Sequence, residues 1–197
     1  MHFDTLIRDG LVFDGTLAKA KPGSVGIRDG VVVTTAAPAD ATADRTIDAR
    51  GCWVMPGFLD NHTHYDAELL LAPGLPESVR HGVTTICMGS CSLSTIYASN
   101  EDCADLFSRV EAVPREHVKR ALSNRGWSDA ASYRAHLENL PLGPNVMAYI
   151  GHSDLRTSVM GLGDSTGDRK PTRDELDRMG QTLEDALDAG FLGPVSY

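Results

Sequence analysis

The sequence contains two histidines one residue apart, His62 and His64, near the end of residues 56–66 (Pro-Gly-Phe-Leu-Asp-Asn-His-Thr-His-Tyr-Asp). In an extended strand, residues i and i+2 point to the same face, so we expect these two imidazoles to project side by side. Two imidazoles on one face can bind one divalent metal at Zn–N distances of about 2.0–2.1 Å. A His-x-His pair taken alone is more often two polar residues hydrogen-bonded at a strand end, so a metal site needs a further ligand nearby.

A cysteine follows the next predicted strand. Residues 83–88 (Val-Thr-Thr-Ile-Cys-Met) are β-branched and apolar and lie between two glycines, which predicts a buried strand, and Cys91 comes three residues later. Because the carboxyl ends of parallel strands meet at one end of a sheet, we expect Cys91 to converge with His62 and His64. A thiolate is a soft ligand that can bridge two metals, so this set suits zinc, with the remaining ligands coming from later strands. A buried, inert thiol is the competing interpretation of Cys91.

The other three cysteines are predicted to be packing residues. Cys87 lies inside the predicted strand, and Cys52 and Cys103 have no potential ligand close in sequence. A single Cys-x3-Cys spacing is not a zinc-knuckle pattern. We therefore expect reduced thiols and no disulfide framework.

Four further polar residues are candidates for the same site. Asp60 and Asp66 flank the histidines, and either could orient an imidazole through its second ring nitrogen or simply cap a loop. His152 and Arg156 follow a later predicted strand and could bind a substrate, with the guanidinium gripping a carboxylate in bidentate fashion. A surface salt bridge is the alternative for Arg156.

The predicted secondary structure that positions these residues differs between the two ends of the chain. Residues 1–50 are predicted to form short strands with Asp-Gly turns, and residues 7–12 are echoed by residues 27–32. This pattern indicates a small β-sheet built of related hairpins. We expect residues 1–55 to form this first domain and residues 56–197 to form the second.

The second domain is predicted to alternate strands and helices. Strands are expected at residues 58–61, 83–88 and 146–150 and from Phe191 onward. Three consecutive helices near residues 100–140, the first capped by Asn100 and the third by Ser128, indicate an insertion over the end of a sheet or a small lid, and Thr172 and Glu175 form a capping box that predicts a further helix. Strand–helix–strand units in series give a parallel sheet with right-handed crossovers, either open or closed into a (β/α)8 barrel. A barrel needs about 250 residues. Since a final strand without a following helix would be an exposed edge, we expect a longer enzyme of which this is the N-terminal part.

Composition narrows the class of protein. The chain has 197 residues, a formal net charge of -9 and 42% hydrophobic residues, which predicts a folded protein and argues against a general nucleic-acid binder. The N-terminus lacks a secretory signal pattern, and no apolar run reaches the ~20 residues of a membrane span. We expect a soluble, cytoplasmic protein without a nucleic-acid or membrane partner.

The ordered motifs resemble a known family. Residues 56–66 are similar to the first-strand signature of the amidohydrolase superfamily of metal-dependent hydrolases. His-Gly-Val-Thr-Thr at residues 81–85, Gly-Ser-Cys at residues 89–91, Gly-His-Ser-Asp-Leu-Arg at residues 151–156 and Ala-Gly-Phe-Leu-Gly at residues 189–193 look more narrowly like the D-aminoacylase (N-acyl-D-amino-acid deacylase) branch. The resemblance covers nearly the whole chain.

This resemblance implies a fold, a reaction and a cofactor. The fold is α/β: a partial (β/α)8 TIM-type barrel of about the first three to four strands, preceded by a small N-terminal β-sandwich portion. The reaction is hydrolysis of the amide of an N-acyl-D-amino acid, a small-molecule substrate, with one or two Zn²⁺ ions in the complete site. His62, His64 and Cys91 would be metal ligands, and His152 and Arg156 would contact substrate. The general base, an aspartate after the last strand, is expected beyond residue 197, so no catalytic residue is assigned here.

Two alternatives stay open. A dihydropyrimidinase-like amidohydrolase would open a cyclic amide, but that branch commonly uses a carboxylated lysine on the fourth strand, and this chain has no lysine after Lys170. A non-catalytic truncated fragment is the second alternative. Pro194 also departs from the family pattern, because a proline inside a central strand removes a ladder hydrogen bond. We expect the 197-residue chain alone to have little or no activity.

Overall fold

The computed structural model describes residues 1–195. Its N-terminal unit, Met1–Gly57, is organised around strand β1 (His2–Val12), which pairs with three other strands. It pairs antiparallel with β2 (Lys21–Arg28) and parallel with β4 (Thr42–Asp48) and β5 (Trp53–Val54). Strand β3 (Val31–Thr34) extends the sheet beyond β2, giving the order β3-β2-β1-β4. Phe3, Leu6 and Ala41 form the small core of this sheet.

Of the three Asp-Gly pairs predicted as turns in the first thirty residues, Asp14 and Gly15 lie in the connection between β1 and β2, and the other two have different outcomes. Asp29 and Gly30 form the turn between β2 and β3, as predicted. Asp9 and Gly10 lie inside β1, where the register with β2 shifts, so this pair makes a bulge and the predicted hairpin turn is wrong. The strand continues through the bulge because Leu11 and the residue after it pair with both β2 and β5.

The second unit, Phe58–Tyr197, is built on parallel strands. Strand β7 (Val83–Met88) lies between β6 (Phe58–Asp60) and β8 (Asn145–Ala148), and a separate pair joins β9 (Ile150–Gly151) to β10 (Pro194–Val195). The predicted strand at residues 146–150 is therefore divided in two. Residues 191–193 precede β10 as irregular chain, and Pro194 pairs with Ile150 at an edge of the described sheet, a position where proline is tolerated.

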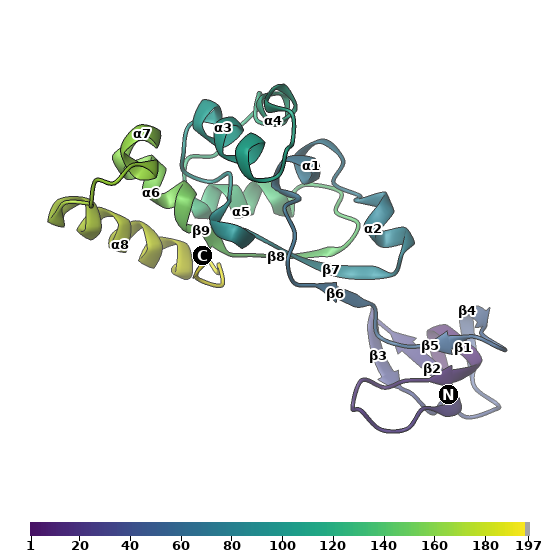
Figure 1. The fold of residues 1–197 in the computed structure, drawn as a ribbon. Helices are drawn as coiled ribbons and strands as arrows, with labels where there is room; N and C mark the ends of the chain where they lie inside the picture. The colour runs from purple at the N-terminus through teal and green to yellow at the C-terminus, as the bar shows by residue number, and fades with distance from the viewer. Residues whose placement is uncertain (196–197) are drawn as a thin grey trace. The chain divides into compact units, whose positions relative to one another are not determined.

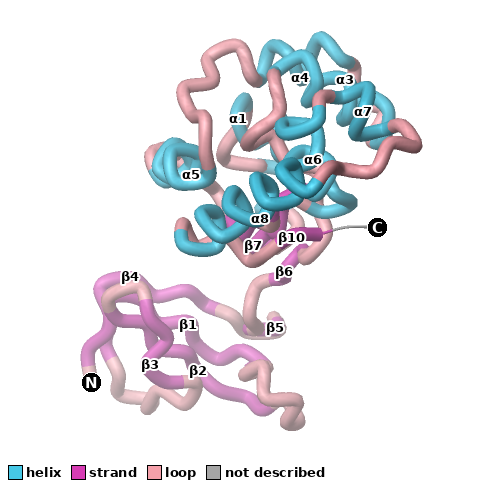
Figure 2. Tube along the Cα trace, turned by 90° about the vertical axis from the view of Figure 1, so that its left-hand side faces the viewer, coloured by secondary structure: helices cyan, strands magenta, loops and turns pink. Residues whose placement is uncertain are grey.

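Helices within residues 1–195 are confined to this second unit, as Figures 1 and 2 show. Within it, α1, α3 and α4 lie over the β6–β7–β8 sheet in Figure 1. The helices are α1 (Asp66–Leu71), α2 (Pro76–Arg80), α3 (Asn100–Val110), α4 (Arg115–Ala121), α5 (Ala130–Glu138), α6 (His152–Met160), α7 (Leu162–Thr166) and α8 (Arg173–Asp188), with a short 3₁₀ turn, η1, at Ser90–Ser92. None of the helices described in residues 1–195 combines the length and apolar character needed to cross a bilayer.

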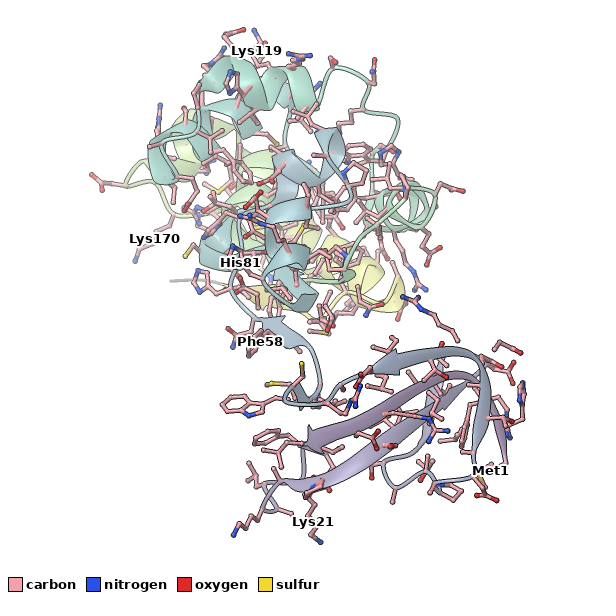
Figure 3. All side chains as sticks on the ribbon, turned by 90° about the vertical axis from the view of Figure 1, so that its right-hand side faces the viewer. Met1, Lys21, Phe58, His81, Lys119 and Lys170 are labelled. Atoms are coloured by element: carbon pink, nitrogen blue, oxygen red, sulfur yellow. The ribbon has the colours of Figure 1, made fainter. Side chains whose placement is uncertain are left out.

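The predicted helical insertion is present as α3, α4 and α5, with caps shifted by one residue. Ser99, not Asn100, caps α3 by accepting the Asp102 amide at 3.1 Å. Asp129, not Ser128, caps α5. These shifts arise because a cap must stand just outside the first turn, which sequence spacing locates only to within a residue or two. Lys119, labelled in Figure 3, lies on α4 of this insertion.

The core of the second unit lies between its sheet and its helices. Ile86, Ile96, Phe107 and Tyr133 are among its fully buried members. Of the cysteines predicted to pack, Cys87 and Cys103 are buried, whereas Cys52 is exposed and its packing role is wrong. Cys52 follows a turn glycine at the surface of the first unit, a position that cysteine content alone does not reveal.

Candidate metal centre

The His-x-His segment lies just beyond the end of β6, which stops at Asp60. Its middle residue, Thr63, is buried and binds the Cys87 carbonyl of β7 through its backbone amide (3.0 Å) and its hydroxyl (2.9 Å). This double anchor turns Thr63 inward and leaves His62 and His64 facing the other way. The two histidines are thus positioned by a turn that is hydrogen-bonded to strand β7. Strand β6, predicted at residues 58–61, ends before them at Asp60.

The two imidazoles lie side by side, with ring centroids 5.3 Å apart and an interplanar angle of 66°. Asp60 accepts the backbone amide of His62 at 3.4 Å, so it caps this turn. Asp66 begins α1 and is completely buried, and burial raises the pKa of its carboxyl to about 7. Its Oδ2 atom is buried and has no hydrogen-bond partner among residues 1–195.

Cys91 reaches the same place from the end of β7. The chain turns through left-handed backbone conformations at Gly89 (φ 79°), Cys91 (φ 50°) and Ser92 (φ 67°). This tight turn brings the Cys91 Sγ atom to 3.0 Å from His62 Nε2. One ligand atom from each of His62, His64 and Cys91 lies within 4.8 Å of the other two.

His64 has the protonation behaviour that metal binding requires. Burial lowers the pKa of its imidazole, and His62 contributes in the same direction, while the carboxylate of Glu111 opposes the shift. The neutral form that binds a metal is therefore favoured at neutral pH. Its Nδ1 atom is buried without a hydrogen-bond partner in the described part of the chain, and its Nε2 atom lies 3.3 Å from Glu111 Oε1. Two nitrogens and one sulfur at this separation are a donor set that fits zinc.

The predicted substrate residues are placed at the start of α6. His152 is its first residue and is half-buried. Arg156 donates from Nε to the Ser165 carbonyl (3.0 Å) and from Nη2 to the Arg169 carbonyl (3.1 Å). The guanidinium thus binds backbone carbonyls of α7 and the loop after it, a contact different from the predicted surface salt bridge. The structure therefore brings His62, His64 and Cys91 together. Arg156 is instead directed toward α7 by its hydrogen bonds to the Ser165 and Arg169 carbonyls.

Comparison with known proteins identifies the family. Residues 45–196 match the Amidohydrolase family. The chain belongs to the amidohydrolase family. It is 58% identical over 195 residues to an uncharacterized protein of Mycobacterium tuberculosis, covering 97% of this chain and 32% of that protein. It is 33% identical to the N-acyl-D-aspartate deacylase of Alcaligenes xylosoxydans xylosoxydans, covering 96% of this chain and 36% of that enzyme. This amidohydrolase chain therefore spans about a third of the length of these relatives.

Solved structures lead to the same branch of the amidohydrolases. The N-acyl-D-glutamate deacylase of Bordetella bronchiseptica, solved with zinc and a phosphonate inhibitor, superposes with a TM-score of 0.81 at 29% identity, over 100% of this chain and 38% of that one. A D-aminoacylase mutant solved with copper chloride superposes with a TM-score of 0.82 at 30% identity, over 98% of this chain and 38% of that one. The resemblance to the N-terminal part of the D-aminoacylase branch is confirmed.

Two carboxylates that contact the segments around these ligands were not found by sequence reasoning. Asp154, fully buried in α6, accepts hydrogen bonds from Ser94 Oγ (2.6 Å) and from the amides of Ile96 (2.8 Å) and Ala98 (2.6 Å). It lies inside the Gly-His-Ser-Asp-Leu-Arg motif, so a signal was present, but nothing in the motif says that the aspartate points into the protein. Glu111, which contacts His64, lies in the insertion and carries no recognisable motif.

Proposed function

We propose that this chain is the N-terminal part of a metal-dependent hydrolase of carbon–nitrogen bonds in non-peptide amides, an N-acyl-D-amino-acid deacylase. One observation carries the proposal: His62, His64 and Cys91, from the ends of two adjacent parallel strands, present ligand atoms within 4.8 Å of one another. Membership of the amidohydrolase family and the similarity to deacylases of D-aspartate and D-glutamate derivatives support it.

The proposed architecture follows from the same comparison. Residues 56–197 would be the first part of a (β/α)8 barrel with the helical insertion of residues 100–140, and residues 1–55 would contribute to a β-sandwich. The parallel order β6-β7-β8, with helices in each connection, supports the barrel. The single sheet within Met1–Gly57 would form one of the two layers of that β-sandwich.

The residues of this chain would hold the metal and keep its ligands in place. His62, His64 and Cys91 would bind it, with zinc favoured by the nitrogen and sulfur donors. A bound zinc ion supplies Lewis acidity, which polarises an amide carbonyl and acidifies water. Thr63 fixes the turn that carries both histidines, and burial lowers the pKa of the His64 imidazole. His152 would contact the N-acyl amino acid at the start of α6, whereas Arg156 serves the α7 loop and is the weaker of the two predicted substrate contacts.

Zinc content tests the metal site. We expect the purified 197-residue protein to retain zinc measured by atomic emission, and His62→Ala and Cys91→Ala to lose most of it. His117→Ala on α4 and Cys52→Ser at the surface of the first unit are matched controls that should leave zinc content unchanged. Zinc content equal to that of the wild type in both site variants would reject the assignment.

Substrate class needs a separate assay. Because the chain spans about a third of its relatives, activity is measured on the chain joined to whatever coding sequence follows it in frame. We expect release of acetate from N-acetyl-D-amino acids, little from the L-enantiomers, and little or no turnover by the 197 residues alone. Opening of dihydrouracil without deacylation would instead favour a cyclic-amide amidohydrolase.

A further inference from the structure

We propose that Glu111, at the C-terminal end of α3, is an oxygen donor to the metal held by His62, His64 and Cys91. This inference rests on the proposed metal site and adds to it a residue from the helical insertion. The metal would then connect three segments of the chain: the turn after β6, the turn after β7 and the insertion.

The contact between Glu111 and His64 has the dimensions of two ligands on one metal. Glu111 Oε1 lies 3.3 Å from His64 Nε2, and the two side chains are 29% and 16% exposed. Two ligands of one tetrahedral zinc ion, at metal–ligand distances of about 2.0–2.2 Å, lie roughly 3.3–3.6 Å apart. The Glu111 carboxylate is not among the ligand atoms that lie within 4.8 Å of one another, so its side chain would have to rotate to reach a metal shared with His62 and Cys91.

The position of Glu111 in its helix is electrostatically unfavourable unless a cation is nearby. It is the C-cap of α3, where its backbone amide binds the Phe107 carbonyl at 2.9 Å. The C-terminus of a helix carries partial negative charge, so a carboxylate there is repelled. The other acids at the start of the same helix, Glu101 and Asp102, occupy the favourable end. A negative side chain placed against the helix dipole and in contact with a proposed metal ligand fits a site for a cation.

Ion pairs join the two helices of the insertion that flank Glu111. Arg115 on α4 binds Asp105 on α3 at 2.5 Å, and Lys119 binds Glu101 at 3.0 Å, so the two helices form one body on either side of Glu111. The chain turns sharply after it, since Ala112 has a φ of 53°. Metal binding would therefore fasten α3 and α4 to the strand ends through a single glutamate.

Two measurements test this on the 197-residue protein. The zinc dissociation constant is determined by competition with a chromophoric chelator, and the visible spectrum of the Co²⁺ form reports the coordination sphere. We expect Glu111→Gln to weaken zinc binding at least about 10-fold, since loss of a residue that only supports a ligand already costs about 10- to 100-fold, and to alter the Co²⁺ spectrum. Glu116→Gln, which removes an equal charge from α4, is the matched control and should change neither.

The outcomes separate this inference from the proposed function. If the wild type binds no zinc, the metal site itself is wrong. If the wild type binds zinc and Glu111→Gln binds it within twofold, or weakens it with an unchanged Co²⁺ spectrum, Glu111 is not a donor. Should Glu111→Gln fail to fold by circular dichroism, Glu111→Asp keeps the charge but shortens its reach. An affinity between those of the wild type and a His64→Ala variant supports the proposal, and an affinity equal to that of the wild type overturns it.

Discussion

The carboxylate of Asp154 accepts the hydroxyl of Ser94 at 2.6 Å, across 60 residues of sequence. The same carboxylate accepts the amides of Ile96 and Ala98, so a single side chain of α6 holds the irregular segment that follows Cys91. Ser94 in turn accepts the Gly151 amide at 3.1 Å, which closes the connection between this segment and the start of α6. Asp154 thus supports the backbone that carries a candidate metal ligand.

Replacing this carboxylate should destabilise the protein strongly. Asp154→Asn places an NH₂ group among backbone amides that need an acceptor, and each buried donor left unsatisfied costs about 1–3 kcal/mol. We expect the free energy of unfolding, measured in urea, to fall by ~3 kcal/mol or more, since the new NH₂ group faces at least two of the four donors that the carboxylate binds. Ser94→Ala removes one donor to Asp154 and the acceptor of the Gly151 amide, and should cost about 2 kcal/mol. A loss below that of Ser94→Ala would contradict the anchoring role of Asp154.

Gly89 and Gly161 offer a matched pair for testing the turn before Cys91. Both have a positive φ, 79° and 80°, with ψ of 11° at Gly89 and 153° at Gly161, but a Cβ at Gly89 would lie 2.3 Å from the Tyr149 carbonyl oxygen, while Gly161 has open space. Gly161→Ala should therefore cost only the backbone strain, about 1–3 kcal/mol. Gly89→Ala should cost more and also reduce zinc content, because relieving the overlap displaces Cys91. Equal unfolding free energies for the two variants would exclude a role for the close approach.

Removal of metal should lower the melting temperature of the wild-type protein but not that of a variant lacking a proposed ligand. A ligand that binds only the folded state stabilises it by about 2.7 kcal/mol at 100 times its dissociation constant. We expect chelation by EDTA to lower the melting temperature of the wild type and zinc to restore it. The His62→Ala variant should show no such response. A wild-type melting curve that is insensitive to both treatments would argue against a structural contribution of the metal.

Glu175 should titrate far below an ordinary glutamate. Hydrogen bonds from Arg169, at 2.8 and 2.9 Å, and from the Thr172 amide at 2.7 Å lower the pKa of its carboxyl to about 2. Since the folded-state pKa lies below the unfolded value, the stabilisation is complete above pH 4.5 and is lost as the pH falls toward 2. NMR titration of the side-chain carboxyl measures this directly. Arg169→Ala should raise the pKa, and Arg173→Ala, which removes the exposed pair with Asp177, should leave it unchanged.

Much of the fold followed from the sequence because its signals are local. The capping box of Thr172 and Glu175, the apolar run at β7 and the turn at Asp29 and Gly30 each depend on neighbours within a few residues. Asp9 gave the same local signal as Asp29 and was misread, because pairing with distant strands decides whether the chain turns or bulges.

The candidate site was predictable only in part for the same reason. His62, His64 and Cys91 were expected to meet because each follows a parallel strand, and the strands are locally encoded. Glu111 and Asp154 act across long sequence separations, and no nearby residue indicates whether a carboxylate points to solvent or to a buried partner. Whether the three ligands hold zinc stays a prediction.

Residues 93–99, the segment held by Asp154, have no regular secondary structure, yet Leu93, Ser94, Thr95, Ile96 and Ala98 are buried. A protease must bind an extended, accessible stretch of chain, so irregular structure alone does not make a cleavage site. A broad-specificity protease should therefore spare this segment and cut instead in exposed irregular stretches, among which residues 167–170 lie in the second unit. Domain-boundary mapping by limited proteolysis would then divide this chain near α7, inside its second unit.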